Sequence, residues 1–202
     1  MVKMDDVTLP VLRTQRLVLS LPIVEDVEEL LAYGLRNESH LAPWLPPPPR
    51  KAFTIESYQG LVQSIQHEFR SGTSVRFWMR LGHDFESKFV GAVSLSEITM
   101  KAFRACHLGY HIDREYEGHG YMSEAVAATI SYAFFDLKLH RIMANYVPSN
   151  RRSERLLERL GFVKEGYAKE YLFIADRWQD HVLTSLTNTE LVGANELVNG
   201  HN

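Results

Sequence analysis

Residues 112–125 (IDREYEGHGYMSEA) constrain the fold of this chain most, because they join a predicted strand to a predicted helix through a short glycine loop. Gly118 and Gly120 let a ligand approach the backbone closely, and the first turn of a helix presents amide groups without a partner in the helix. A Rossmann fingerprint would need glycine at Ser123, and a P-loop would need Gly-Lys-Ser or Gly-Lys-Thr, so both motifs are excluded. The junction predicts a site for another phosphate-bearing ligand, or a tight turn that only leads into the helix.

The composition is that of an ordinary globular protein of one domain. The chain has 202 residues, of which 45% are hydrophobic and 23% charged, and its formal net charge is −3. This charge offers no general attraction for nucleic acid or for an anionic membrane. The single cysteine, Cys106, can form neither an intramolecular disulfide nor a thiolate zinc site, and it fits a reducing compartment. Because the chain lacks an apolar signal segment and an apolar run long enough for a membrane helix, we expect a soluble cytoplasmic protein.

Hydrophobic periodicity predicts a mixture of strands and helices in one domain, residues 1–187. Strands joined by hairpins and interrupted by single helical crossovers predict one mixed sheet with helices on both faces, an α+β or α/β fold. The prolines at 46–49 predict a stiff surface loop, and the polar residues 188–202 predict a flexible tail. The predicted helices span 24–35, 55–70, 121–135 and 150–160, and the predicted strands span 16–21, 75–81, 89–96, 105–112, 141–147, 167–173 and 177–186.

A second motif lies downstream of the glycine loop. Residues 150–162 (NRRSERLLERLGF) place Asn150 and Ser153 at the start of a short helix that ends in Leu-Gly-Phe. The glycine loop and this segment together resemble motifs A and B of the Gcn5-related N-acetyltransferases (GNATs), whose element order is similar over nearly the whole chain. The stretches HRIMANY (140–146), GFVKEGYAK (161–169) and WQDHVL (178–183) resemble the RimJ type of ribosomal-protein-alanine N-acetyltransferase within that superfamily.

The resemblance implies a binding site for acetyl-CoA and no metal. It implies a single, mostly antiparallel sheet with helices on both faces, in which two parallel strands splay apart and admit the pantetheine arm. The superfamily has Gln or Arg where this chain has Glu117, so we expect no phosphate contact from that side chain. The arginines within 151–159 bind a phosphate or form a solvated helix face. The implied cofactor contacts are Tyr110, His111, Ile112, Gly118, His119, Gly120, Tyr121, Met122, Ser123, Asn150, Arg152 and Ser153.

Acetyl transfer to an amine needs a neutral amine, a polarised carbonyl group and a proton for the departing thiolate. An α-amino group with a pKa near 8 is roughly a tenth neutral at pH 7, so an N-terminal acceptor needs only a mild base. The resemblance implies Ser153 as the proton donor, with an ordinary helix-start hydroxyl as the alternative. It implies Asn150 as a pantetheine contact, with the N-cap of the same helix as an alternative or additional role. Glu97 and Glu170 are the leading candidates for the base.

Five other side chains have two interpretations each. Trp44 closes over the acceptor or only packs, and Asp180 attracts a cationic N-terminus or satisfies buried backbone donors. Cys106 is a buried small hydrophobic residue or an acyl-carrying nucleophile, which would need a base beside it. His107 and His111 line the acceptor side or are ordinary surface or core histidines.

The resemblance therefore implies an enzyme. We expect transfer of the acetyl group of acetyl-CoA to the N-terminal α-amino group of an alanine on a small-subunit ribosomal protein, by direct attack in a ternary complex. The partner is that protein terminus, without direct contact to nucleic acid or membrane. One alternative is the same chemistry on another protein N-terminus, a lysine or a small amine. The other is a non-catalytic ribosome-assembly or CoA-binding regulatory protein.

Overall fold

The computed structural model describes residues 8–46 and 53–190, which form an eight-stranded sheet with four α-helices. The strand order is β1-β2-β3-β4-β5-β6-β8-β7, and every neighbouring pair is antiparallel except β5 and β6. The predicted mixed, mostly antiparallel sheet is confirmed. The strands are β1 (Val11–Arg13), β2 (Leu17–Ser20), β3 (Val75–Leu81), β4 (Phe89–Thr99), β5 (Ala105–Ile112), β6 (Arg141–Tyr146), β7 (Val163–Ile174) and β8 (Arg177–Thr187), and the helices are α1 (Val27–Leu41), α2 (Ile55–Arg70), α3 (Tyr121–Ser131) and α4 (Arg151–Arg159).

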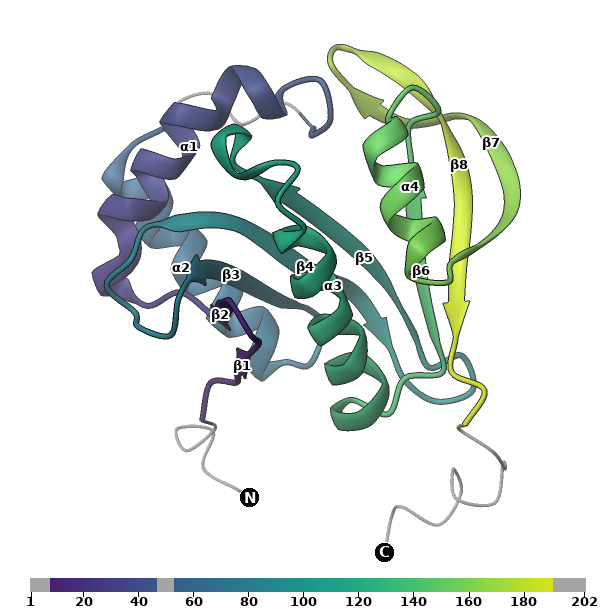
Figure 1. The fold of residues 1–202 in the computed structure, drawn as a ribbon, viewed down its shortest axis with the longest axis horizontal. Coiled ribbons are helices and arrows are strands. Elements are labelled where there is room, and N and C mark those ends of the chain that lie inside the picture. The colour runs from purple at the N-terminus through teal and green to yellow at the C-terminus, as the bar shows by residue number, and fades with distance from the viewer. Residues whose placement is uncertain (1–7, 47–52, 191–202) are drawn as a thin grey trace, which may run out of the picture.

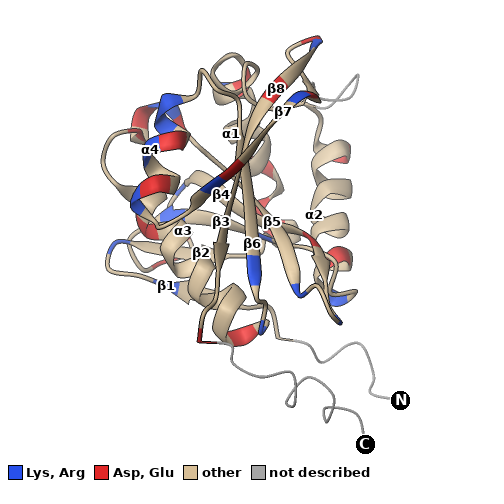
Figure 2. Ribbon diagram, turned by 90° about the vertical axis from the view of Figure 1, so that its right-hand side faces the viewer, with Lys and Arg blue, Asp and Glu red and all other residues tan. Residues whose placement is uncertain are grey.

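Helices cover both faces of the sheet (Figure 1). α1 and α2 lie on one face, and α3 and α4 lie on the other, with the strands between them (Figure 2). Side chains alternate accordingly: Trp78 and Ala92 pack with α1 and α2, whereas their sequence neighbours Phe77 and Val93 belong to the cluster that includes α3. The helices therefore shield much of both faces of the described sheet.

The strands part between β5 and β6, which lie side by side at one end and diverge toward the other (Figure 1). Parallel pairing joins residues 105–107 to residues 141–143 and then stops, although both strands continue. β5 stays paired with β4 as far as Ile112, and β6 stays paired with β8 as far as Tyr146. Gly91 allows the close approach of β4 to β5, because a Cβ at this position would lie 2.6 Å from the carbonyl oxygen of His111. The predicted splayed parallel pair is confirmed.

Several elements differ from their predicted bounds. α1 continues to Leu41, beyond the predicted end at residue 35. β7 begins at Val163 and not at residue 167, because most side chains of this edge strand are exposed and periodicity marks no boundary there. β1 is too short for a periodic signal. The third helix changes after Ser131 into a π-helical segment, Tyr132–Asp136.

Two predicted segments fall wholly or partly outside the described residues. These are the prolines at 47–49 and residues 191–202 of the predicted tail. Asn188 is only 7% exposed, and its amide donates to the carbonyl of His140, so the packed fold includes the first residue of that predicted tail. In the described part of the chain, no helix is long and apolar enough to cross a membrane.

Candidate active site

A cavity of about 560 Å³ opens where β5 and β6 part. It is lined by residues 108–112 of β5, residues 144–147 at the end of β6, the glycine loop, α4 and the end of α1. Its volume is in the range of small-molecule sites. The two sequence motifs therefore meet at one cavity. Of the predicted cofactor residues, all except His119 line it: Tyr110, His111, Ile112, Gly118, Gly120, Tyr121, Met122, Ser123, Asn150, Arg152 and Ser153.

The glycine loop is held in shape by the N-terminal segment of the chain. Gly118 and Gly120 both have a φ of 80°, a left-handed conformation that favours glycine. Arg16 donates from its backbone amide and from Nε to the Glu124 carboxylate, at 2.8 and 2.7 Å, and from Nη1 to the carbonyl of His119 at 3.0 Å. The start of α3 is thus fixed by the protein itself, and its free amides and helix dipole favour an anion at this end of the cavity.

Ser153 and Tyr110 meet across the gap between α4 and β5. The Tyr110 hydroxyl lies 2.6 Å from Ser153 Oγ. The Ser153 hydroxyl does not cap α4, because Asn150 Oδ1 accepts the hydrogen bond of the Ser153 amide at 3.1 Å and caps the helix. Burial raises the pKa of Tyr110 to about 12, against the opposing effect of the hydrogen bond with Ser153. Tyr110 therefore stays protonated at neutral pH and can supply a proton to the serine.

Glu117 spans the mouth of the cavity. Its carboxylate accepts a hydrogen bond from the guanidinium of Arg152 and lies 3.6 Å from Nε2 of His40. The Arg152 side chain is 76% exposed, so an anion at the mouth can reach it. Acidic and basic residues are interspersed along α4 (Figure 2), and Arg151 pairs with Glu154 at 2.6 Å. The Glu117 charge is thus balanced by Arg152.

On the α1 side, the cavity is lined by residues that lie on the opposite face of the sheet from α4. Ala144 of β6 and Val182 of β8 belong to the hydrophobic cluster that includes α4, so Asn145 and His181 face the opposite side of the sheet. Both residues line the cavity, together with Trp44 from the turn that follows α1. A molecule that lies between β5 and β6 can therefore be approached from the α1 side by a second one.

His111 belongs to this second wall. Its Nδ1 atom lies 2.8 Å from the hydroxyl of Tyr33, a buried residue of α1. Burial, with a smaller contribution from the positive charge of Arg76, lowers the pKa of His111 to about 4. His111 is therefore neutral at pH 7 and does not repel a cationic amine. His107, in contrast, does not line the cavity and lies 3.6 Å from the Glu97 carboxylate.

Three predicted carboxylates do not line the cavity: Glu97, Glu170 and Asp180. The Glu97 side chain is 79% exposed. Asp180 accepts hydrogen bonds from the Tyr167 hydroxyl at 2.6 Å and from the Glu170 amide at 2.9 Å, at a bulge of β7 where Glu170 has a φ of 49°. This geometry agrees with the interpretation that Asp180 satisfies a backbone donor, although the donor lies at an exposed bulge and not in the core.

Sequence reasoning assigned no role to Asn145 or His181. Both occur in stretches that resemble the family, HRIMANY and WQDHVL. Their position at the cavity depends on the strand order, in which β8 lies between β6 and β7. Periodicity along one strand contains no information about that order.

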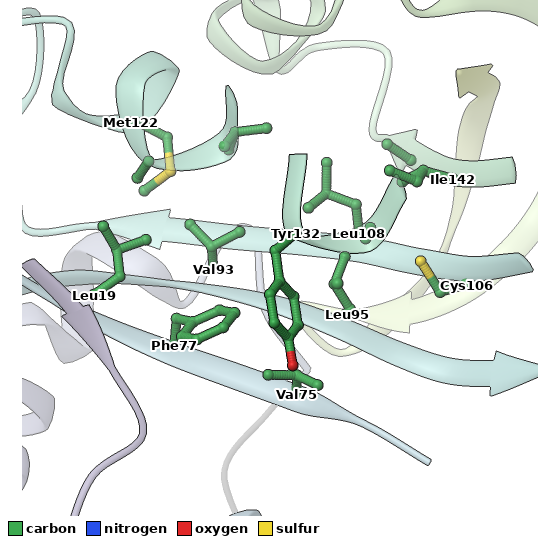
Figure 3. Close-up of a cluster of buried hydrophobic side chains, with 14 of the residues drawn as sticks. Leu19, Val75, Phe77, Val93, Leu95, Cys106, Leu108, Met122, Tyr132 and Ile142 are labelled. Carbon is green, nitrogen blue, oxygen red and sulfur yellow. The ribbon is translucent and has the colours of Figure 1, made fainter. Parts of the chain in front are cut away.

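Cys106 lies in the hydrophobic core beside Leu95 and Leu108 (Figure 3), with no exposed surface. Burial raises the pKa of its thiol to about 12, so it does not form the thiolate that a nucleophile needs. Its interpretation as a small hydrophobic residue is confirmed. Among the residues that the structure describes, no group of three or more His, Cys, Asp or Glu could hold a metal ion.

The family model of the acetyltransferase (GNAT) domain matches residues 16–163, which contain the glycine loop, the parted strands and α4. The chain belongs to the GNAT acetyltransferases. The predicted superfamily and the predicted kind of enzyme, an N-acetyltransferase, are confirmed.

Several other proteins are similar to this GNAT chain over most of its length. The [ribosomal protein uS5]-alanine N-acetyltransferase of Escherichia coli is 40% identical over 179 residues, which are 89% of this chain and 91% of the relative. The structure of the ribosomal-protein-S5-alanine acetyltransferase from Vibrio fischeri has a TM-score of 0.84 and 38% identity, covering 91% of this chain and all of that one. Mycobacterium smegmatis RimJ, in complex with CoA-disulfide, has a TM-score of 0.82 and 27% identity over 94% of this chain and 91% of its own.

Proposed function

We propose that this chain transfers the acetyl group of acetyl-CoA to the N-terminal α-amino group of an alanine on ribosomal protein uS5, by direct attack in a ternary complex. The observation that carries the choice of acceptor is the 40% identity with the E. coli enzyme named for that reaction, over 91% of its length. The cavity between β5 and β6 supports the chemistry, because it is bounded by an anion-favouring helix start on one side and by a neutral histidine on the other.

The cofactor is assigned to the α3–α4 side of the cavity. The amides at the start of α3 receive the pyrophosphate, and Arg152 is within reach of a further phosphate at the mouth. Residues 110–112 of β5 have no strand partner on the β6 side, so their backbone groups are free to hydrogen-bond an extended arm. Acetyl-CoA supplies the thioester that is cleaved. Ser153 donates the proton that the departing thiolate needs, and the Tyr110 hydroxyl at 2.6 Å replaces it.

The acceptor is assigned to the α1 side. Trp44 and the neutral His111 form a wall that accommodates a peptide terminus without repelling its charge. The buried Cys106 leaves direct transfer as the simplest route, since no acetylated cysteine is needed. The partner is the N-terminus of a ribosomal protein in the cytoplasm, without contact to nucleic acid or membrane.

The test is to incubate the purified chain with labelled acetyl-CoA and a mixture of small-subunit ribosomal proteins, and to read their intact masses. We expect one protein to gain one acetyl group at its N-terminal residue. Labelling of lysine side chains or of free small amines instead would redirect the assignment to another acceptor. Tight CoA binding without any transfer would favour a regulatory or assembly protein.

A further inference from the structure

We propose that Nε2 of His181 accepts the proton that the acceptor α-amino group loses during acetyl transfer. The inference rests on the proposed function and supplies the base that the predicted carboxylates do not. His181 lies on β8 and lines the cavity from the α1 side, although only 3% of the residue is exposed.

The hydrogen bonds of His181 decide which nitrogen carries the proton. Nδ1 lies 3.0 Å from the carbonyl oxygen of Gln179. A carbonyl oxygen can only accept a hydrogen bond, so we assign the proton of the neutral ring to Nδ1. Nε2 then carries the lone pair, and in the described part of the chain no group donates to it. His181 is thus a cavity-lining residue whose acceptor nitrogen is bound by no described group.

The orientation of the ring is fixed by its neighbours. Gln179, whose carbonyl holds Nδ1, is itself buried and donates from Nε2 to the carbonyl of Ile174 at 3.2 Å. The Tyr171 ring lies 5.4 Å from the imidazole, and its hydroxyl accepts a hydrogen bond from Asn145 at 3.3 Å. These contacts connect β6, β7 and β8, so the imidazole is positioned before an acceptor arrives, as an efficient proton acceptor requires.

The other candidates fit this role less well. The carboxylates of Glu97 and Glu170 do not line the cavity. His111 lines it, but its Nδ1 is bound to Tyr33, and its pKa of about 4 makes it a weak base at pH 7. His181 lines the α1 side of the cavity, and the backbone carbonyl of Gln179 leaves its Nε2 atom as the nitrogen that can accept a proton.

The amine lone pair forms a C–N bond with the carbonyl carbon of the thioester, and the C–S bond breaks. One proton leaves the attacking nitrogen for His181 Nε2, and one passes from Ser153 to the departing thiolate. Ser153 recovers a proton from the Tyr110 hydroxyl, which takes one from solvent. The products are the acetylated amine and CoA thiol, and His181 afterwards releases its proton to solvent.

The test compares two substitutions at one position. His181→Asn retains an amide N–H that can donate to the Gln179 carbonyl, but it has no atom at the place of Nε2. We expect kcat to fall about 100-fold, the lower end of what general base catalysis contributes, while the dissociation constant of acetyl-CoA stays within about twofold. His181→Ala leaves space for a free imidazole, and we expect added imidazole to restore part of its kcat. Recovery of kcat by imidazole, with the dissociation constant of acetyl-CoA unchanged, is the result that a missing base predicts.

The outcomes separate this inference from the proposed function. A wild-type chain that acetylates an alanine-terminated peptide, together with a fully active His181→Asn, would overturn the inference and leave the function intact. A folded His181→Ala variant that is inactive and insensitive to imidazole would also overturn it, and if His181→Asn does not fold, this variant decides. A wild type that is inactive on α-amines overturns both.

Discussion

Replacement of Ser153 by alanine separates the chemistry of the site from its structure. The change removes the 2.6 Å hydrogen bond between Ser153 Oγ and the Tyr110 hydroxyl, while the Ser153 amide keeps its cap at Asn150. Loss of one such bond costs about 1 kcal/mol, which lowers Tm by roughly 2–4 °C in a domain of this size. A stability of about 5–15 kcal/mol tolerates that loss. Under the proposed role of Ser153 as the proton donor, we expect its removal to lower kcat by about 10²–10⁴-fold, or about 3–5 kcal/mol in the barrier.

The assay measures thiol release with an alanine-terminated peptide, and CoA affinity by calorimetry. Tyr110→Phe deletes the same hydrogen bond from the other side and keeps the serine, so we expect less than about a tenfold loss of kcat. Ser131→Ala is the matched control, because this exposed serine of α3 only bonds to the carbonyl of Ala127. If Ser153→Ala keeps its kcat, the serine is not the proton donor. A loss in Tyr110→Phe as large as that in Ser153→Ala would contradict the expectation that solvent can replace the proton of the serine.

Three further substitutions test the surrounding structure. Gly91→Ala places a Cβ 2.6 Å from the His111 carbonyl oxygen, so we expect a loss of roughly 1–3 kcal/mol in the free energy of unfolding and a raised KM for acetyl-CoA. The control is Gly60→Ala, whose Cβ would have nothing within 4 Å, and denaturant titrations are expected to show a neutral or stabilising effect. Cys106→Ala retains full kcat at a cost of about 1 kcal/mol in stability; loss of activity in a folded variant would reopen a covalent route. Burial raises the pKa of Asp113, but hydrogen bonds from Arg36 and the Glu115 amide outweigh it, so the pKa lies below its ordinary 3.8. Because the pKa of Asp113 is lower in the folded state, its carboxylate stabilises the fold above the unfolded pKa, and this contribution is lost as the pH falls through the folded pKa. We expect the free energy of unfolding, followed by circular dichroism, to depend less steeply on pH in Asp113→Asn than in the wild type. An unchanged pH dependence would contradict this assignment.

The parts of the fold that local patterns specify could be predicted. Thr54 caps α2 by accepting from the Ser57 amide, and Asn150 caps α4 in the same way, so each helix start is visible in the sequence. Gly161, the glycine of the Leu-Gly-Phe segment at the predicted end of this helix, has a φ of 86°. The glycine loop was likewise predicted from a few neighbouring residues, and Gly118 and Gly120 both have a φ of 80° there.

The acceptor side could not be predicted in the same way. His181 reaches the cavity only because β8 lies between β6 and β7, a long-range arrangement that no local pattern encodes. Glu170 was a reasonable candidate on a regular strand, but the bulge between Ala168 and Leu172 changes the facing of its residues. A carboxylate without its strand register is therefore weak evidence for a base.

The central claim is transfer to an α-amino group within the cavity between β5 and β6. Its most direct test is the rate of acetylation of two peptides with the uS5 N-terminal sequence, each containing a lysine, one with a free N-terminal alanine and one with a blocked N-terminus. At pH 7 roughly a tenth of the α-amino groups are neutral, compared with about one lysine side chain in 2,500. We predict acetylation of the free terminus alone, with no product from the blocked peptide. Comparable labelling of the lysine in both peptides would contradict the account.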